Sequence, residues 1–324
     1  LAQLLIDGLR LRHAAALPGL TIASCDNLQG NGHKLQALIH ATATAQDAAL
    51  MQWMDTHCAF PCSMVDRIVP AATDEVAAAA KDTLGLKDDC ALSTETFWEW
   101  VIEDNFIAGR PAWEQVGVEM VQSVDAFEEA KIRLLNATHS CIAWAGTLVG
   151  YQYIHEGTHD PVIRRMAYDY VTDDVIPVLD TPENPCPLDL PRYRDVVLDR
   201  FSNPAIQDTN QRVAMDGFSK VPGFIAPTIR ERLARGESIQ SVAMLPALFL
   251  AYLQRWHAGQ IAYTYQDQAM DPAAAHAMCE SADPVAAFAA DTVLWGALAS
   301  HPQLVGALRV AHERVGLFVK NHLG

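Results

Sequence analysis

The sequence predicts an α/β plus α fold, in which part of a helix-covered sheet domain is followed by a mainly helical domain. Strand-like apolar runs alternate with helical patterns over the first 120 residues, whereas long helical patterns dominate from about residue 125 onwards. The length of 324 residues also exceeds what one hydrophobic core usually serves. We therefore expect two domains, residues 1–120 and residues 121–324.

The first elements of the sheet part are a helix, a strand and a second helix. Leu1 to Ala16 has an amphipathic helical pattern with no initiating Met and no strand before it, which indicates a chain that starts inside a domain. Thr21 to Leu28 is a strand-like run that ends in short polar residues, and Gly30-Asn-Gly32 follows as a turn. One long helix is predicted from Gly32 to Thr56.

Two more strands and a helix complete the sheet part. Residues 60–70 and 97–102 are strand-like, and residues 74–83 form an Ala-rich helical pattern between them. Ligands of such sheets bind beyond the carboxyl ends of the strands. Asn27 and Asp66 lie near two such ends, so both are candidates for a ligand site.

The helical part is predicted from six long helical patterns, at residues 125–151, 161–176, 190–201, 245–257, 284–299 and 302–321. Proline-rich breaks at residues 180–187 and 270–272 are predicted to be loops, because proline lacks a backbone donor and disfavours helix in the residue before it.

Composition and charge exclude several classes of protein. Half of the residues are apolar (50%) and 19% are charged, which is typical of a folded chain. The formal net charge is −16 and no Lys/Arg cluster is present, so nucleic acid is not an expected partner. No apolar run is long enough for a membrane span, and Asp7 and Arg10 interrupt the stretch where a signal peptide would be apolar. A cytoplasmic protein without membrane contact is expected.

The seven cysteines are predicted to be buried free thiols, because they form an odd set scattered through apolar surroundings. The alternative is a metal site, since His57, Cys58 and Cys62 could supply three zinc ligands. There is no second ligand cluster, and Cys58-Ala-Phe-Pro-Cys62 looks like the entry to a buried strand. We therefore predict structural cysteines and no metal site.

One predicted helix carries polar residues in an apolar context. Asp125-Ala-Phe-Glu128 has the form of a capping box, and the residues after it are apolar nearly all round. Lys131, Asn136 and His139 interrupt this apolar run. On an α-helix, His139 lies about 80° and Asn136 about 140° round from Lys131, over roughly 12 Å of axis, so the three can line one cleft.

Two interpretations of these three residues are open. A desolvated lysine holds its proton less tightly, because burial disfavours the charged form, and it can then act as a base near neutral pH. The alternative is a lysine with its stem on the apolar surface, a capped asparagine and a hydrogen-bonded core histidine. Spacing alone favours the alternative.

The segment Lys131-Ile-Arg-Leu-Leu-Asn136-Ala-Thr-His139 resembles the Lys-x4-Asn-x2-His signature of the polyol-specific long-chain dehydrogenases, the mannitol dehydrogenase family. Other segments resemble the family in the same order, over essentially the whole chain: Ser24-Cys-Asp-Asn27, Phe60-Pro-Cys-Ser-Met-Val-Asp66-Arg67, Phe106-Ile-Ala-Gly-Arg-Pro111, Asn203-Pro-Ala-Ile-Gln-Asp208 and Asp216-Gly-Phe-Ser-Lys220. The resemblance favours the catalytic interpretation. It implies that residues 1–120 are the C-terminal part of a Rossmann-like dinucleotide-binding domain and residues 121–324 the substrate and catalytic domain.

The resemblance also implies chemical roles. Lys131 would be the general base that takes the hydroxyl proton while hydride leaves the same carbon for NAD. Asn136 and Asn27 would hold the developing alkoxide through their amide donors, and His139 would orient the substrate and Lys131. No metal would be needed, because a lysine and two amides replace the Lewis acid of zinc-dependent enzymes.

Four further residues would bind cofactor or substrate. Val65 and Asp66 would lie by the nicotinamide, with Asp66 also near the substrate. Arg212 and Lys220 would bind substrate hydroxyls, and exposed cations on a helix are the alternative for these two.

The sequence departs from the family at the phosphate site. Family members begin with a Gly-rich strand, turn and helix, and no G-x-G-x-x-G occurs in these 324 residues. We therefore expect that the cofactor-binding site lacks its phosphate-binding part. These residues do not determine whether NAD or NADP is preferred. A catalytically incomplete helical domain is the alternative to an enzyme.

The expected small-molecule partner is a polyol or ketose. Segments at residues 153–158, 207–212 and 263–267 resemble the arabinitol 4-dehydrogenase branch of the family, so D-arabinitol to D-xylulose is the first expectation. Mannitol to fructose is second, because one extra CHOH changes the site little. Hexuronates are third, since their carboxylate would want a dedicated Arg pocket. A monomer or weak oligomer is expected.

Overall fold

The structure is a computed structural model that describes residues 1–44 and 48–323. The chain forms two compact units. Unit 1 comprises Leu1–Ile68 and Glu95–Glu128, and unit 2 comprises Val69–Thr94 and Glu129–Gly324. The boundary between residues 120 and 121 that we expected from the sequence stays a prediction.

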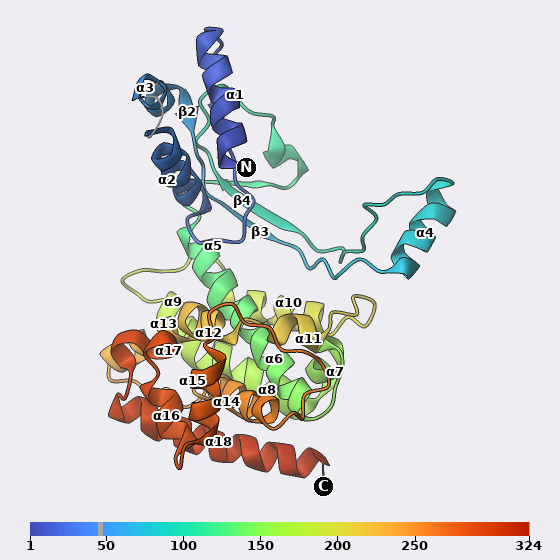
Figure 1. The fold of residues 1–324 in the computed structure, drawn as a ribbon, viewed down its shortest axis with the longest axis vertical. Helices are drawn as coiled ribbons and strands as arrows, with labels where there is room; N and C mark the ends of the chain where they lie inside the picture. The colour runs from blue at the N-terminus through green and yellow to red at the C-terminus, as the bar shows by residue number, and fades with distance from the viewer. Residues whose placement is uncertain (45–47, 324) are drawn as a thin grey trace. The chain divides into compact units, whose positions relative to one another are not determined.

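Unit 1 combines short strands with helices (Figure 1). Its elements are α1 (Ala2–Ala14), β1 (Leu20–Thr21), α2 (Asn31–Thr44), α3 (Ala48–His57), β2 (Cys58–Ala59), β3 (Ser63–Asp66), β4 (Glu99–Glu103), η1 (Trp113–Val116), β5 (Glu119–Val121) and the first four residues of α5 (Asp125–Ala130). Strand β1 pairs with β2 in parallel, and β4 pairs with β3 antiparallel and with β5 in parallel. The unit is therefore α/β, as predicted.

Two predicted elements of unit 1 differ from the structure. The strand expected from Thr21 to Leu28 ends at Thr21, because the polar residues after it form a loop whose carbonyls at Ser24 and Asp26 accept from the Asn31 amide. The helix expected over residues 32–56 is two helices, α2 and α3, and residues 45–47 between them lie outside the described residues.

An apolar cluster forms the core of unit 1. Helices α1, α2 and α3 pack against one another, and each contributes fully buried side chains, among them Ile6, Ile39 and Met54. Ile22 and Phe60, which directly follow β1 and β2, complete the cluster. These helices thus bury the apolar residues beside the short parallel pair.

Unit 2 is mainly helical in its described residues, which also agrees with the prediction. Its elements are α4 (Asp74–Leu84), η2 (Lys131–Asn136), α6 (Ala137–Leu148), α7 (Ile154–His159), α8 (Pro161–Tyr170), η3 (Val171–Val175), α9 (Ile176–Leu179), α10 (Leu190–Phe201), α11 (Asn210–Ala214), α12 (Gly217–Lys220), η4 (Val221–Ile225), α13 (Ala226–Ala234), α14 (Met244–His257), α15 (Pro272–Glu280), α16 (Pro284–Ala290), α17 (Thr292–Trp295), η5 (Gly296–Leu298) and α18 (Pro302–Leu323).

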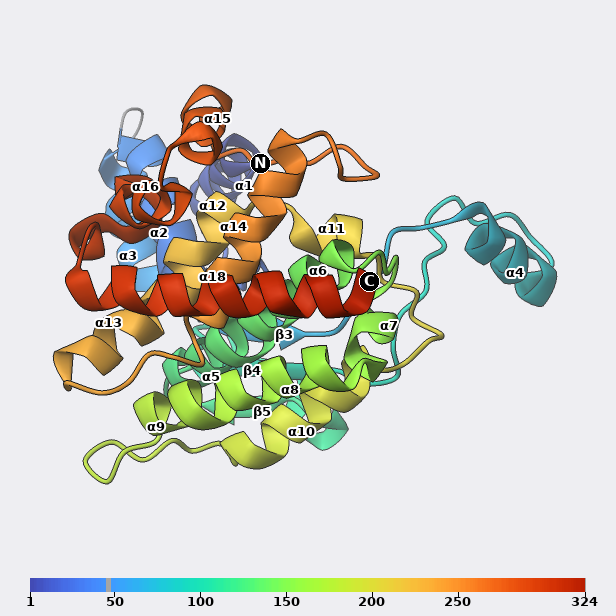
Figure 2. The ribbon, with the colours of Figure 1, turned by 90° about the horizontal axis from the view of Figure 1, so that it is seen from below.

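Helix α6 lies at the centre of unit 2, where other helices surround it. It packs against α7, α8, α11 and α14, and nearly all its residues are buried. Its Trp144 ring packs against Phe249 of α14 in a tilted arrangement, with ring centroids 4.9 Å apart. Gly217 is needed for this packing, since a Cβ there would lie 2.1 Å from the Phe249 ring. Figure 2 shows α18 lying across α14 on the outside of the unit.

The helix predicted over residues 284–299 is also wrong in detail. The structure has α16, α17 and the 3₁₀ turn η5 in its place. Asp291 causes the break, because its carboxylate accepts from the backbone N–H groups of Val293 and Leu294 and so caps a new helix start.

The capping box predicted at Asp125 and Glu128 does not form. The Asp125 N–H donates to Ser123 Oγ (3.2 Å), and both Glu128 carboxylate oxygens accept from the Gly30 N–H at 3.0 and 3.1 Å. Glu128 thus ties helix α5 to the loop before α2, a contact between segments 98 residues apart. No local sequence rule predicts such a contact.

The cysteines are free, but most are not buried. Cys62 and Cys141 are buried, Cys25 and Cys90 are exposed, and Cys58, Cys186 and Cys279 are half-buried. The prediction of seven buried thiols is therefore wrong for five of them, because several lie in loops or at element ends.

Candidate functional site

The helix that carries the candidate catalytic residues changes its winding at those residues. Lys131–Asn136 is π-helical between the α-helical segments α5 and α6, and the Ala137 N–H donates to the Ile132 carbonyl five residues back. The hydroxyl of Tyr170, a fully buried residue, donates to the Arg133 carbonyl at 2.6 Å and supports this wider turn. π-Helical turns occur frequently at functional sites.

This winding corrects the angles expected for an α-helix. Lys131 stands at the start of the π-helical segment and is 8% exposed, and Asn136 stands at its end and is half-buried. The Asn136 carbonyl accepts from Ser140 Oγ at 2.9 Å. Because a π turn holds more residues than an α turn, the 80° and 140° separations do not apply here.

His139, Asp208 and Arg212 form a connected group in unit 2. His139 Nε2 lies 3.2 Å from Asp208 Oδ2, although the N–H bond is not aligned for a hydrogen bond. Arg212 donates to both oxygens of the same carboxylate, at 2.6 and 2.5 Å. The His139 ring also stacks on Phe201, with centroids 4.3 Å apart. Asp208 thus holds a buried imidazole and a half-exposed guanidinium together.

Burial and charge set the protonation states of this group. Burial lowers the pKa of His139 and outweighs the opposing effect of Asp208, so the imidazole is neutral at pH 7. Burial alone would raise the pKa of Asp208, but His139 and Arg212 bring it well below its usual range. A permanently charged carboxylate therefore faces a neutral imidazole.

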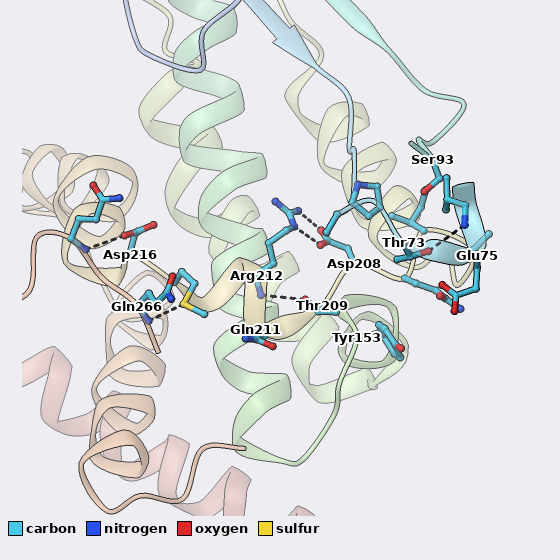
Figure 3. Close-up of a pocket in the computed structure, with 18 residues that line it drawn as sticks. Thr73, Glu75, Ser93, Tyr153, Asp208, Thr209, Gln211, Arg212, Asp216 and Gln266 are labelled. Carbon is cyan, nitrogen blue, oxygen red and sulfur yellow. Dashed lines mark hydrogen bonds and ion pairs between the residues drawn. The ribbon is translucent and has the colours of Figure 1, made fainter. Parts of the chain in front are cut away.

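A cavity of about 790 Å³ opens beside this group in unit 2 (Figure 3). Arg212, Asp208 and Thr209 lie along its centre, Tyr153 and Glu75 lie on one side, and other lining residues include Gln207, Asp216 and Gln266. Many of these side chains carry oxygen or nitrogen, so the cavity offers hydrogen-bond partners to a hydroxylated ligand. Lys131 and Asn136 are not among its lining residues.

Lys220 is partly buried rather than a fully exposed surface cation. Its Nζ donates to the Val213 carbonyl at 2.6 Å, across the turn between α11 and α12. Burial lowers the pKa of Lys220 to about 8. The negative charge of Asp216 opposes this shift, and the positive charge of Arg212 adds to it. A cation that releases its proton so readily is uncommon on an ordinary surface.

The remaining candidates belong to unit 1. Asp66 ends strand β3 and is 3% exposed, and Val65 pairs with Trp100 of β4. Asn27 lies in the exposed loop between β1 and α2. The carboxyl end of a strand is where α/β sheets bind ligands, so Val65 and Asp66 lie at a position that suits a ligand. Their contact with the nicotinamide stays a prediction.

Sequence reasoning missed three residues that organise these sites. Asn31 is 2% exposed and its side chain exchanges two hydrogen bonds with the backbone of Ser63 at 2.8 and 3.0 Å, which fastens the loop after β1 to β3. Asp208 precedes Arg212 by four residues, a spacing in the sequence that allows the two side chains to pair on a helical turn. Asp216 at the cavity has a φ of +57°, a left-handed backbone rare outside glycine.

The zinc set considered from the sequence does not come together. The His57 ring stacks on Trp53 at 5.3 Å, and its Nδ1 lies 2.6 Å from Thr56 Oγ1. Cys62 instead lies near His33 and Glu103, the one group with the composition and spacing of metal ligands among the residues that the structure describes.

No helix within the described ranges combines the length and the apolar character that a membrane crossing requires.

Comparisons with known proteins match both parts of the chain. The model of the mannitol dehydrogenase Rossmann domain matches residues 1–115, and that of the mannitol dehydrogenase C-terminal domain matches residues 123–316. These matches confirm the predicted fold class, a Rossmann-like domain followed by a mainly helical domain.

Individual relatives and a solved structure agree with these matches. The chain is 57% identical to D-arabinitol 4-dehydrogenase of Ralstonia nicotianae and 50% identical to that of Klebsiella pneumoniae, over 91% and 90% of its length. It spans 63% of the length of each relative. The Pseudomonas fluorescens mannitol 2-dehydrogenase, solved with NAD and D-mannitol, superposes with a TM-score of 0.81 at 33% identity, covering 98% of this chain and 65% of that one.

Proposed function

The chain belongs to the mannitol dehydrogenase family, and from this membership we propose that it is part of a D-arabinitol 4-dehydrogenase. The enzyme would transfer hydride between D-arabinitol and NAD, with D-xylulose as the product. The identity of 57% with one D-arabinitol 4-dehydrogenase, over 91% of this chain, carries the proposal. Since the chain spans 63% of that relative, the proposal concerns the whole protein.

Lys131 is the proposed general base. It takes the hydroxyl proton, while hydride leaves the same carbon as the carbonyl forms. NAD, when bound, supplies the nicotinamide ring that accepts the hydride. The burial of Lys131 on a π-helical turn supports this role, because a desolvated amine is a better base near neutral pH than an exposed one.

Amide and imidazole groups assist this step in the proposal. Asn136 and Asn27 donate hydrogen bonds to the oxygen as negative charge develops on it, an effect typically worth about 3 kcal/mol per donor. His139, whose neutral ring lies 3.2 Å from Asp208, orients the substrate and Lys131. No metal takes part in this proposed step.

The other proposed contacts hold the two reactants. Val65 and Asp66 contact the nicotinamide, and Asp66 also lies near the substrate. Arg212 and Lys220 bind substrate hydroxyls, which the position of Arg212 in the polar cavity supports. We further propose a cytoplasmic monomer or weak oligomer. The division into a dinucleotide-binding part, residues 1–120, and a substrate part, residues 121–324, belongs to the same proposal.

Mannitol and hexuronates are the alternative substrates. The similarity to a mannitol 2-dehydrogenase solved with D-mannitol favours the hexitol as the second candidate. One additional CHOH is expected to change kcat/KM by about 10- to 200-fold at most, so mannitol should be a poorer substrate rather than an inert one.

An assay of the full-length protein tests the proposal. We expect NAD reduction with D-arabinitol, slower reduction with D-mannitol, and a loss of most turnover in Lys131→Ala. Lys320→Ala, an exposed lysine near the end of α18, is the control and should keep full activity. Absence of NAD reduction with both polyols would favour a catalytically incomplete protein, and full turnover in Lys131→Ala would exclude this lysine as the base.

A further inference from the structure

Three side chains of unit 1 that the proposed hydride transfer does not use converge on one point. His33 lies in the first turn of α2, Cys62 directly precedes β3, and Glu103 ends β4. Their imidazole, thiol and carboxylate donor atoms all lie within 4.8 Å of one another. We propose that these three residues bind a divalent, thiophilic cation of the Zn²⁺ type.

The backbone holds two of these ligands in a fixed relation. The Cys62 N–H donates to Glu103 Oε2 at 2.8 Å, and the Glu103 N–H donates to the Cys62 carbonyl at 3.0 Å. The residues thus form a closed pair at the start of β3 and the end of β4. Glu103 Oε1 takes no part in this pair, so it can serve as a metal ligand without breaking either bond.

A glycine brings the third ligand close. A Cβ at Gly32 would lie 2.5 Å from the Phe60 carbonyl oxygen and 2.6 Å from that of Pro61, so only glycine lets the start of α2 approach this backbone. The start of α2 therefore lies against the Phe60–Pro61 backbone, which brings His33 close to Cys62.

The donor set and the space suit a tetrahedral cation. Zinc binds Cys, His and Glu at about 2.0–2.3 Å, which places neighbouring ligand atoms roughly 3.6 Å apart. Reaching that spacing from separations of up to 4.8 Å needs a shift of about 1 Å. The exposed His33 side chain is free to turn by this amount. Three protein ligands leave the fourth position for water.

The electrostatic surroundings favour a cation. The Glu103 carboxylate belongs to the cluster itself. The Glu128 carboxylate lies near the same loop, because both of its oxygens accept from the Gly30 N–H, three residues before His33. Two carboxylates thus place negative charge around a buried thiol. A divalent ion would offset this charge.

Spectroscopic titration of the full-length protein with Co²⁺, after treatment with a chelator, tests the site. Co²⁺ bound by a thiolate gives a ligand-to-metal charge-transfer band in the near ultraviolet. We expect one Co²⁺ per chain with this band, and its displacement by Zn²⁺. Cys62→Ser should lose the band, whereas Cys58→Ser, a half-buried thiol four residues earlier, should keep it.

Two further variants keep the test decisive if Cys62→Ser does not fold. His33 is exposed, and Glu103→Gln retains an oxygen that can accept from the Cys62 N–H. Each of His33→Ala and Glu103→Gln should weaken Co²⁺ binding by more than about tenfold. No charge-transfer band in the wild-type protein, or unchanged binding in both variants, would overturn the proposal. This readout is independent of polyol oxidation.

Discussion

At the scale of single residues, Asp208 connects two groups that we propose to contact the substrate. Its carboxylate is 5% exposed, lies 3.2 Å from His139 and accepts two hydrogen bonds from Arg212. A buried charge is stable only when its partners are in place. We therefore propose that Asp208 is a positioning residue, which would act on the substrate through His139 and Arg212.

Replacing Asp208 by Asn should affect substrate binding more than the chemical step. The amide keeps the shape but cannot accept a charged hydrogen bond on both of its atoms, so Arg212 loses its fixed direction. Since a hydrogen bond to a charged group is worth roughly 1.5–3 kcal/mol, we expect kcat/KM for the polyol to fall about 10- to 100-fold. The KM should account for most of this loss.

The control is Asp199→Asn, in the exposed ion pair with Arg164. Surface pairs contribute about 0–1 kcal/mol, so this variant should behave like the wild type. A fall in kcat at unchanged KM in Asp208→Asn would argue against the positioning role.

Lys220 should make polyol binding dependent on pH. Its pKa of about 8 lies below the unfolded value, so folding favours the neutral amine and stability rises with pH between about 8 and 10.5. Polyol binding should instead weaken as pH rises, because in our proposal the ammonium form of Lys220 binds the substrate hydroxyls. We expect KM for the polyol to rise about tenfold from about pH 7 to about pH 9, where nine tenths of the amine is neutral.

Lys220→Met provides the comparison, because it keeps the length of the side chain without a titrating group. Its KM should be high at every pH, and its profile should be flat. A rise in KM with pH that persists in this variant would assign the effect to another group.

At the scale of elements, three helices of the described chain each contain a π-helical segment, η2, η3 or η4. Tyr170, at the end of α8, supports the Arg133 carbonyl. Within the described residues, two further π-helical segments, η3 and η4, pack against η2. A turn of this kind places Lys131 and Asn136 at its two ends, so the winding determines how the proposed base and the proposed amide donor lie relative to each other.

Tyr170→Phe should therefore weaken both folding and turnover. Without the hydroxyl, the buried Arg133 carbonyl loses a donor, which should lower the free energy of unfolding by about 1–3 kcal/mol. Since the turn also orients Lys131, kcat should fall while NAD binding changes little. Urea unfolding and steady-state kinetics measure the two effects.

Tyr168→Phe is the matched control. Tyr168 lies on the same helix and is half-buried, with the Arg194 guanidinium 3.9 Å from its ring centre. This contact needs only the ring, so the variant should keep its stability and kcat. Equal losses of stability and kcat in both variants would show that the Tyr170 hydroxyl has no specific effect on the π-helical turn.

At the scale of the whole molecule, each unit has fully buried apolar residues of its own. Met54 is fully buried in unit 1 and Leu304 in unit 2. Shortening either side chain to Ala should cost about 2–5 kcal/mol through lost burial and a remaining cavity. We expect hydrogen exchange to accelerate mainly in the unit that carries the substitution, which peptide-resolved mass spectrometry measures. Equal acceleration in both units would indicate a single cooperative structure.

Much of this organisation was predictable because it is encoded locally. Helix α10 begins and ends where its periodicity indicated, at residues 190 and 201, and α4, α14 and α18 lie within two residues of their predicted bounds. The change from an α/β to a helical pattern, and the motif around Lys131, were equally visible. A helix can be predicted from local sequence because its backbone hydrogen bonds join residues four apart. The order of motifs along the chain can likewise be read without knowing which distant segments come into contact.

Contacts between distant segments were decided only by the tertiary structure. Glu128 satisfies the Gly30 N–H instead of its own helix start, Cys62 meets His33 and Glu103 instead of His57, and Asp208 joins His139 to Arg212. The π-helical segment that begins at Lys131 likewise accepts a hydrogen bond, at the Arg133 carbonyl, from the hydroxyl of Tyr170, 37 residues further along the chain. Each polar group binds the partner that packing brings near, and packing depends on all the elements together. The sequence alone thus determined the family, the fold class and the candidate residues, and the tertiary structure decided the partners that those residues contact.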